Sequence, residues 1–301
     1  YDTMDKALKD DEGLINKYGI TYEQWDLYNG NIDCKSIEEG RLSDVKLAII
    51  QRSRGYSNRK SITIAEIIKT AALIRKYSPK TIIFVDNCYG EFVEDQEPLE
   101  AGADIMAGSL IKNPGGTIAL SGGYVVGRKD LISKVADNFT VPGIGREIGC
   151  ESSEALRLMY QGLFLAPKLV EESLLSAHYL SLMFKSLGYK VDPDFKEKKT
   201  DIIQSIYFDK KEDLILFVQT LQRFSPVDSQ VKPIPWDMPG YDHQVIMASG
   251  SFISGSSSEL SADAPIKEPY VAYFQGGVSW HYSKIAIDSY RDELIEKKRD
   301  V

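Results

Sequence analysis

The sequence is poor in the features that mark several large protein classes. Three cysteines in 301 residues are too few and too scattered for a disulfide framework or a cysteine-based zinc site. No apolar run approaches the roughly 20 residues that span a bilayer, and the opening residues have neither the basic start nor the apolar run of a signal peptide. Basic residues number 36 against 44 acidic ones, so the chain lacks the positive face that nucleic acid requires. We therefore expect a reduced, cytoplasmic protein without membrane or nucleic-acid partners.

The chain does contain enough apolar sequence for a sizeable folded core. Hydrophobic residues make up 43% of the composition and charged residues 27%, a balance that does not match disorder. The length predicts two domains. A change of character near residue 150 places a large domain at 1–163 and a smaller one at 164–301. The chain opens with Tyr1 instead of Met, and we expect the N-terminal part of the first domain to be missing.

Buried strands alternate with a helix in the first domain. Lys46–Gln51 and Thr81–Asp86 are short continuous apolar runs, which are typical of parallel strands covered on both faces. Thr63–Tyr77 between them has helical periodicity, and Thr63 with Glu66 forms a capping box. Such a unit makes the two strands parallel. Further strands are predicted at Asp104–Ser109 and Gly122–Gly127, so the first domain is predicted to be an α/β domain with a mainly parallel sheet.

The second domain has a different pattern. A long helical region at 151–187, which we expect Pro167 to interrupt, leads into it. A strand at 201–208, a helix at 212–222 and a strand at 244–248 follow. This order is typical of a small α+β domain.

Two charged residues follow neighbouring predicted strands. Asp86 ends one strand, and Lys112 comes shortly after the next and precedes Asn-Pro-Gly-Gly, which lets the backbone approach a ligand. Taken alone, Asp86 is equally well explained as a turn cap and Lys112 as a solvated lysine. Together they match a pyridoxal phosphate site, which needs a lysine for the Schiff base and a carboxylate that keeps the pyridine nitrogen protonated. No spacing of His, Asp and Glu indicates a metal site.

The segment 85–116 carries a family resemblance. Its Asp-Asn-x-Tyr turn, Gly-Ala-Asp and Ser-x-x-Lys resemble the cysteine/methionine metabolism family of pyridoxal phosphate enzymes, which includes methionine γ-lyase and the cystathionine lyases. The chain is more similar still to the branch called aluminium resistance protein. The segments that resemble this branch, in order, are IQRSRGY (50–56), VDNCYGEFVE (85–94), GSLIKNPGG (108–116), PGIGREIG (142–149), QGLFLAP (161–167), MPGYDHQVIMASGSF (238–252), ELSADAPIKEPY (259–270) and QGGVSWH (275–281).

The resemblance implies a fold type I, aspartate aminotransferase-like architecture with pyridoxal 5'-phosphate as cofactor. Lys112 is then the Schiff-base lysine, Asp86 the partner of the pyridine nitrogen, and Ser109 a ligand of the phosphate. Tyr1 matches the family's tyrosine that stacks on the ring. The family's phosphate-binding loop at a helix N-terminus lies upstream of that tyrosine and has no counterpart here. A homodimer or homotetramer is also implied.

Four more residues near the predicted strand ends are candidates. Arg52 and Arg54 suit a substrate carboxylate, because a guanidinium group binds carboxylates in a planar, bidentate way; surface arginines on a polar loop are the alternative. Tyr89 is a candidate acid or base, with packing as the favoured role. Asn87 is a candidate hydrogen-bond partner of the cofactor, and equally a turn former.

The family resemblance implies a lyase that cleaves a carbon–sulfur bond of a sulfur amino acid. A transaminase or racemase with the same cofactor stays open, because Asp86 and Lys112 serve all three reactions. So does a non-catalytic relative with a role in stress or metal resistance.

Overall fold

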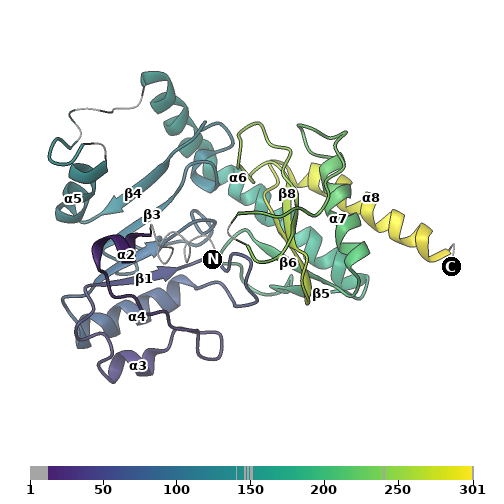
Figure 1. Cartoon of the computed structure of the whole chain (residues 1–301). Coiled ribbons are helices and arrows are strands. Elements are labelled where there is room, and N and C mark those ends of the chain that lie inside the picture. Colours follow the sequence, from purple (N-terminus) through teal and green to yellow (C-terminus); the bar gives the residue numbers. More distant parts are fainter. Residues whose placement is uncertain are drawn as a thin grey trace.

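The computed structural model of the chain describes residues 13–139, 141–145, 147, 149, 152–239 and 241–299. The predicted stacking residue Tyr1 lies outside these residues. The chain forms two lobes, each built on its own sheet, and one long helix runs between them (Figure 1).

The first lobe contains the predicted parallel strands. β1 (Leu47–Gln51), β2 (Ile82–Asp86) and β3 (Ile105–Ser109) pair in parallel in that order, which confirms the predicted pairing. β4 (Gly123–Gly127) adds an antiparallel edge. The helical elements of this lobe are α2 (Leu14–Tyr18), α3 (Cys34–Glu38), α4 (Ile64–Tyr77), the short 3₁₀ turn η1 (Asn113–Gly115) and α5 (Lys129–Phe139).

The capping box predicted for α4 is present. The Thr63 hydroxyl accepts a hydrogen bond from the Glu66 backbone at 3.1 Å, and the Glu66 carboxylate accepts one from the Thr63 backbone at 2.9 Å. Both bonds satisfy donors that a helix start leaves unpaired. The buried side of the helix, including Ile67 and Ile74, packs with Ile83 of β2 in one core cluster. The helix thereby covers the sheet whose strand ends carry the candidate site.

The second lobe is a five-stranded sheet in the order β5-β6-β9-β8-β7, in which each adjacent pair of strands is antiparallel. Its core contains the rings of Phe184, Phe217 and Tyr290. The elements of this lobe are β5 (Lys190–Asp192), β6 (Gln204–Phe208), α7 (Lys211–Arg223), β7 (Val245–Ala248), β8 (Ser261–Pro265), β9 (Tyr270–Gln275) and α8 (Trp280–Arg299).

The two lobes share one helix. α6 (Ser153–Ser186) has 34 residues and continues through Pro167, so the predicted interruption was wrong. Proline removes only its own bond to the preceding turn, and burial of Ala166 and Val170 on either side keeps the helix in place. The boundary predicted between residues 163 and 164 falls inside this helix, which contacts η1 in the first lobe and β5 and β6 in the second.

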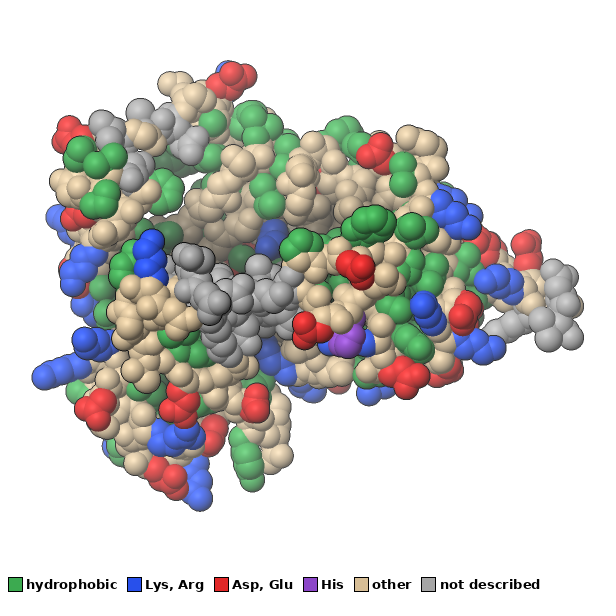
Figure 2. Space-filling view, viewed as in Figure 1, with side chains coloured by type: hydrophobic (Ala, Val, Ile, Leu, Met, Phe, Trp, Pro, Cys, Tyr) green, Lys and Arg blue, Asp and Glu red, His purple; other side chains and the backbone are tan. Residues whose placement is uncertain are grey.

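A smaller apolar cluster fills the junction between the lobes. Tyr89 of the first lobe packs there with Ile202, Val271 and Tyr273 of the second and with Val170 of α6. The face drawn in Figure 2 carries interspersed acidic and basic side chains, and no single charge dominates it. Within the described part of the chain, no helix combines the length and apolar character needed to cross a membrane.

Candidate functional site

The carboxyl ends of β1, β2 and β3 meet at one edge of the first sheet. Gln51 pairs with Asp86, and Asp86 pairs with Ala107, so the segments that follow these strands emerge side by side. In parallel sheets of this kind, the loops at this edge form the ligand-binding crevice. The candidate residues of the first lobe that the structure describes lie in or next to these loops.

Asp86 and Lys112 both contact the short segment that contains Cys88 and Tyr89. The Asp86 carboxylate accepts a hydrogen bond from the Cys88 backbone at 3.1 Å, and the Lys112 Nζ lies over the ring of Tyr89, the next residue. The pKa of Cys88 is raised to about 12, mainly by burial; among the nearby charges, that of Asp86 raises this pKa and that of Lys112 lowers it. Both side chains are half-buried.

Tyr89 supplies the surface on which the lysine lies. The Lys112 Nζ is 4.8 Å from the centre of the Tyr89 ring, within the range of a cation–π contact. Tyr89 is buried and has a φ of 70°, a left-handed conformation that is uncommon for a bulky residue. Its neighbours hold this conformation, because the Tyr89 carbonyl accepts a hydrogen bond from Ile202 of the second lobe at 3.2 Å.

Ser109 is the last residue of β3, three residues before Lys112. Its hydroxyl accepts a hydrogen bond from the Ile111 backbone at 3.3 Å, and its side chain is half-buried. The hydroxyl therefore shapes the turn into the Lys112 loop.

Gly116 packs the Lys112 turn against α6. A Cβ at Gly116, whose φ is 58°, would lie 2.3 Å from the Gly162 carbonyl oxygen of α6. The absence of a side chain thus brings the Lys112 turn against the helix.

Asn87 points into a buried polar network. Its side-chain oxygen accepts a hydrogen bond from Arg52 at 2.7 Å, and its amide nitrogen donates to Glu97 at 2.8 Å and to the Tyr124 hydroxyl at 3.4 Å. Asn87 is fully buried. Its amide groups are therefore satisfied within the chain.

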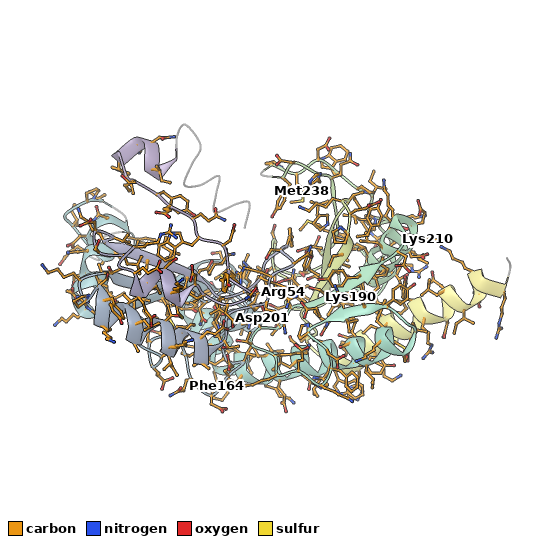
Figure 3. All side chains as sticks on the ribbon, turned by 90° about the horizontal axis from the view of Figure 1, so that it is seen from below. Arg54, Phe164, Lys190, Asp201, Lys210 and Met238 are labelled. Carbon is orange, nitrogen blue, oxygen red and sulfur yellow. The ribbon has the colours of Figure 1, made fainter. Side chains whose placement is uncertain are left out.

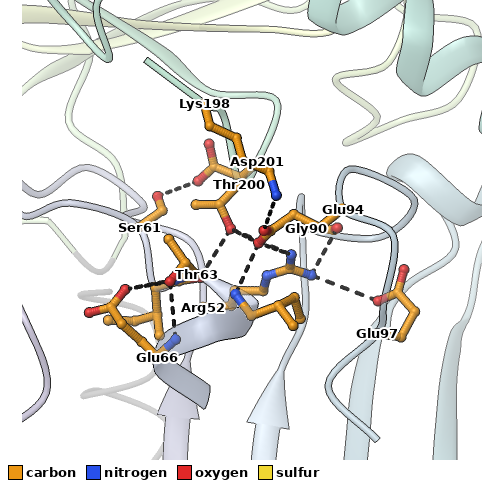
Figure 4. A network of polar contacts seen from close by, with 12 residues as sticks. Arg52, Ser61, Thr63, Glu66, Gly90, Glu94, Glu97, Lys198, Thr200 and Asp201 are labelled. Atoms are coloured by element: carbon orange, nitrogen blue, oxygen red, sulfur yellow. Dashed lines mark hydrogen bonds and ion pairs between the residues drawn. The ribbon is translucent and has the colours of Figure 1, made fainter. Parts of the chain in front are cut away.

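Arg52 is the cation of this network and is completely buried, not on the surface (Figure 4). Its guanidinium group donates to Asn87, to the Gly90 carbonyl at 2.9 Å and to the Glu94 carboxylate at 3.1 Å. A second carboxylate, that of Glu97, is 3.7 Å away. Glu94 also accepts a hydrogen bond from Thr200 of the second lobe at 2.7 Å, so the network spans both lobes.

Arg54 also joins the lobes. Its guanidinium group donates to the Asp192 carboxylate at 2.5 Å and to the Ser205 hydroxyl at 3.2 Å. Asp201, nearby, accepts a hydrogen bond from Ser53 at 2.7 Å. Figure 3 shows Arg54 and Asp201 where the two lobes meet. Both predicted substrate arginines are thus already paired with carboxylates of the chain.

Asp263 was not singled out in the sequence analysis. It lies in the middle of β8, is buried, and accepts hydrogen bonds from the Tyr56 hydroxyl at 2.5 Å and from Gln275 at 3.0 Å. Burial raises its pKa to about 6, while these two bonds and the Lys112 charge lower it. The second lobe therefore places a carboxylate against Tyr56, in the loop that follows β1. In the sequence, the one indication of a special role for Asp263 is that it is an acidic residue among the small residues of Ser261–Pro265.

Tyr56 also lines a cavity of about 390 Å³ between the loop after β1 and the β8–β9 hairpin. Tyr273 and Tyr241 form its aromatic walls, with ring centres 5.4 and 5.6 Å from that of Tyr56. Asn58 and Lys267 supply polar groups. This volume falls in the range of about 300–1,000 Å³ that is usual for small-molecule sites.

The donor set suits a pyridoxal phosphate ring. An amine, a carboxylate and an aromatic face lie around one point, at a strand edge where ligands bind. The Ser109 hydroxyl is the predicted hydrogen-bond donor to the phosphate group. In the described part of the chain, no three His, Cys, Asp or Glu side chains are arranged to hold a metal ion.

Comparison with known proteins gives one family match over nearly the whole chain. The model of the methionine gamma-lyase family matches residues 1–295. The uncharacterized protein YnbB of Bacillus subtilis is 45% identical over 303 residues, which cover 99% of this chain and 72% of YnbB.

Solved structures resemble the chain closely. A Listeria monocytogenes protein named as a candidate cystathionine beta-lyase involved in aluminum resistance is 44% identical, with a TM-score of 0.93 over 97% of this chain and 73% of that one. A Campylobacter jejuni candidate O-acetylhomoserine (thiol)-lyase is only 16% identical, with a TM-score of 0.61 over 96% of this chain and 74% of its own. That structure contains a lysine joined to pyridoxyl phosphate. The second likeness shows a shared fold, as the sequence predicted.

Proposed function

The chain belongs to the methionine gamma-lyase family, and we propose that it is a pyridoxal phosphate-dependent lyase that cleaves a carbon–sulfur bond of a sulfur amino acid. The observation that carries the proposal is that Asp86 and Lys112 both contact the short segment Cys88–Tyr89: Asp86 accepts a hydrogen bond from the Cys88 backbone, and the Lys112 Nζ lies 4.8 Å from the centre of the Tyr89 ring. Were the two side chains in separate regions, they could not serve one ring. The names of the relatives support the same class of reaction.

Asp86 and Lys112 divide the chemistry between them. Bound pyridoxal phosphate supplies an electron sink for negative charge that develops at the substrate's α carbon. The Asp86 carboxylate holds the proton on the pyridine nitrogen, which keeps that sink effective. The Lys112 amine would hold the cofactor, and as a base it would take the proton from the α carbon of the substrate. Cys88 stays a protonated thiol, because burial raises its pKa to about 12.

The other candidates receive supporting roles in the proposal. The Tyr89 ring carries the Lys112 amine, as the 4.8 Å contact supports. Ser109 donates to the phosphate, and Tyr1 covers the ring. We assign Asn87, Arg52 and Arg54 to holding the loops around the site, because their polar groups are already engaged.

The substrate's side chain is assigned to the cavity beside Tyr56. Its tyrosine walls suit a thioether, and Lys267 offers a positive charge to a carboxylate. A cytoplasmic location and assembly into a homodimer or homotetramer are further parts of the proposal, which follow from the cysteine-poor sequence and from the family.

Two measurements test the function. The protein loaded with pyridoxal phosphate should absorb visible light, and Lys112→Ala should abolish this absorption. With methionine, cystathionine or cysteine, the loaded protein should release ammonia and a 2-oxo acid. Amino-group exchange without ammonia release would indicate a transaminase instead, and a colourless loaded protein would indicate a non-catalytic relative.

A further inference from the structure

Glu91 is a buried carboxyl group at the base of the site, in the loop that follows Asp86. Only 3% of the residue is exposed. One carboxyl oxygen, Oε1, accepts a hydrogen bond from the Tyr124 hydroxyl of β4 at 2.8 Å. The group fits because residue 108 of β3 is glycine: a Cβ there would lie 2.3 Å from the same oxygen. Two strands of the sheet therefore shape a place for this side chain.

The carboxyl group has no positive partner in the described part of the chain. Its other oxygen, Oε2, is buried and has no hydrogen-bond partner among these residues. Arg52, the buried cation of the region, pairs with Glu94 and lies near Glu97 instead. An unpaired buried carboxylate is very costly, and such groups instead remain protonated. The pKa of Glu91 is raised to about 8: burial is the largest cause, the charges of Glu97 and Asp86 also raise this pKa, and hydrogen bonds, including the one from Tyr124, lower it.

Glu91 also joins the two loops that carry the proposed cofactor residues. Its backbone carbonyl accepts a hydrogen bond from the Asn113 side chain at 3.1 Å, and Asn113 follows Lys112 directly. On the other side, Glu91 and Asp86 flank the turn that contains Cys88 and Tyr89. A change at Glu91 therefore reaches both the lysine and the aspartate.

Building on the proposed function, we propose that Glu91 is a positioning residue that works as an uncharged acid, and that loss of its proton to solvent weakens the hold on the cofactor. The groups that face it are the Tyr124 hydroxyl and the carboxylates of Glu97 and Asp86. A negative Glu91 repels both carboxylates and has no ion-pair partner among the described residues. The loops that hold Asp86 and Lys112 then separate.

Stability of the cofactor-free protein is the first readout. In the unfolded chain, Glu91 has its ordinary pKa, so between that value and about 8 the folded state binds one more proton. The free energy of unfolding consequently falls as the pH rises through this window and levels off above it. Glu91→Gln has nearly the same shape and no charge, so it should lack this part of the pH dependence. The control Asp95→Asn, an exposed carboxylate of the same loop, should retain it.

Cofactor affinity is the second readout, and its pH window lies higher. Visible absorption titrations with pyridoxal phosphate should give the wild type and Glu91→Gln similar dissociation constants below about pH 8. Above about pH 8, the dissociation constant of the wild type should increase. The total increase should be about tenfold for each unit by which bound cofactor raises the pKa of Glu91. Glu91→Gln should lack this additional increase, and Asp95→Asn should follow the wild type.

The outcomes separate the inference from the proposed function. Parallel pH profiles of stability for wild type and Glu91→Gln would reject the uncharged acid. Divergent stability with parallel affinities would reject its link to the cofactor. A protein that binds no cofactor at any pH would instead reject the proposed function, while the stability readout still decides the state of Glu91. If Glu91→Gln does not fold, carbon NMR of the wild type with labelled glutamate carboxyl groups decides the question. The inference is overturned if none of these groups titrates near pH 8.

Discussion

The ammonium group of Lys112 lies over the ring of Tyr89, 4.8 Å from its centre. This contact connects the turn after β3 with the loop after β2, and Tyr89 in turn packs against the second lobe. The lysine is thereby held by an aromatic surface whose own position depends on both lobes.

Tyr89→Phe keeps this surface and Tyr89→Leu removes it. If the ring carries the lysine, Tyr89→Phe should change cofactor affinity and turnover little, while Tyr89→Leu should lower affinity by about tenfold, the upper part of the range for a cation–π contact. Absorption titration and initial rates measure both. A large loss of turnover with unchanged affinity in Tyr89→Phe would instead indicate an acid or base role for the hydroxyl.

Arg52→Ala should destabilise the protein strongly, because it leaves the carboxylates of Glu94 and Glu97 without their buried cation. Removing one partner of a buried ion pair costs about 3–5 kcal/mol. The exposed pair of Lys60 and Glu197 at 3.3 Å offers a matched control, and Lys60→Ala should cost less than about 1 kcal/mol. Denaturant unfolding compares them. If Arg52→Ala had normal stability but a raised KM, the result would support a role of Arg52 in substrate binding instead.

Cys88 should react very slowly with alkylating reagents at neutral pH. Its pKa of about 12 against an ordinary 9.0 leaves about a thousandfold less thiolate than in the unfolded chain. Mass spectrometry after timed alkylation, in the native protein and in denaturant, measures the ratio. Rapid modification of native Cys88 would show that the thiol is activated. By linkage, the raised pKa contributes stability that is lost only as the pH climbs from the ordinary value towards about 12.

Gly116→Ala tests the contact between the Lys112 turn and α6. Gly116 and Gly19 have similar φ angles, 58° and 62°, but a Cβ meets the Gly162 carbonyl at 2.3 Å in the first case and nothing within 4 Å in the second. Gly19→Ala should therefore cost only the backbone strain, about 1–2 kcal/mol, and Gly116→Ala clearly more, with weaker cofactor binding. Equal losses of stability in the two variants would contradict the close contact.

Local sequence patterns predicted the first lobe well. The apolar run ending at Asp86 and the Thr63–Glu66 cap are signals contained within a few residues, and they placed β2 and α4 within one residue of their ends. The order of the predicted strands put Asp86 and Lys112 at the ends of successive strands, and these strands, β2 and β3, pair in parallel.

Long-range partners escaped the sequence analysis. Arg54 looked like a loop arginine because its partner Ser205 lies 151 positions along the chain. Glu91 carries no local signal of burial, since its surroundings arise when distant segments come together, and the small residues around Asp263 are only a weak signal. Pro167 was misread for the opposite reason: a local rule predicted a break, and packing on both sides of the proline overrode it.

The unbroken course of α6 has a mechanical consequence. A helix of 34 residues is a rod about 51 Å long, and its early turns support the lysine loop while its later turns carry the second sheet. A tilt of the helix at one end therefore also moves the other end. We expect the two lobes to move together for this reason. Small molecules would then enter and leave through movements of side chains and short loops.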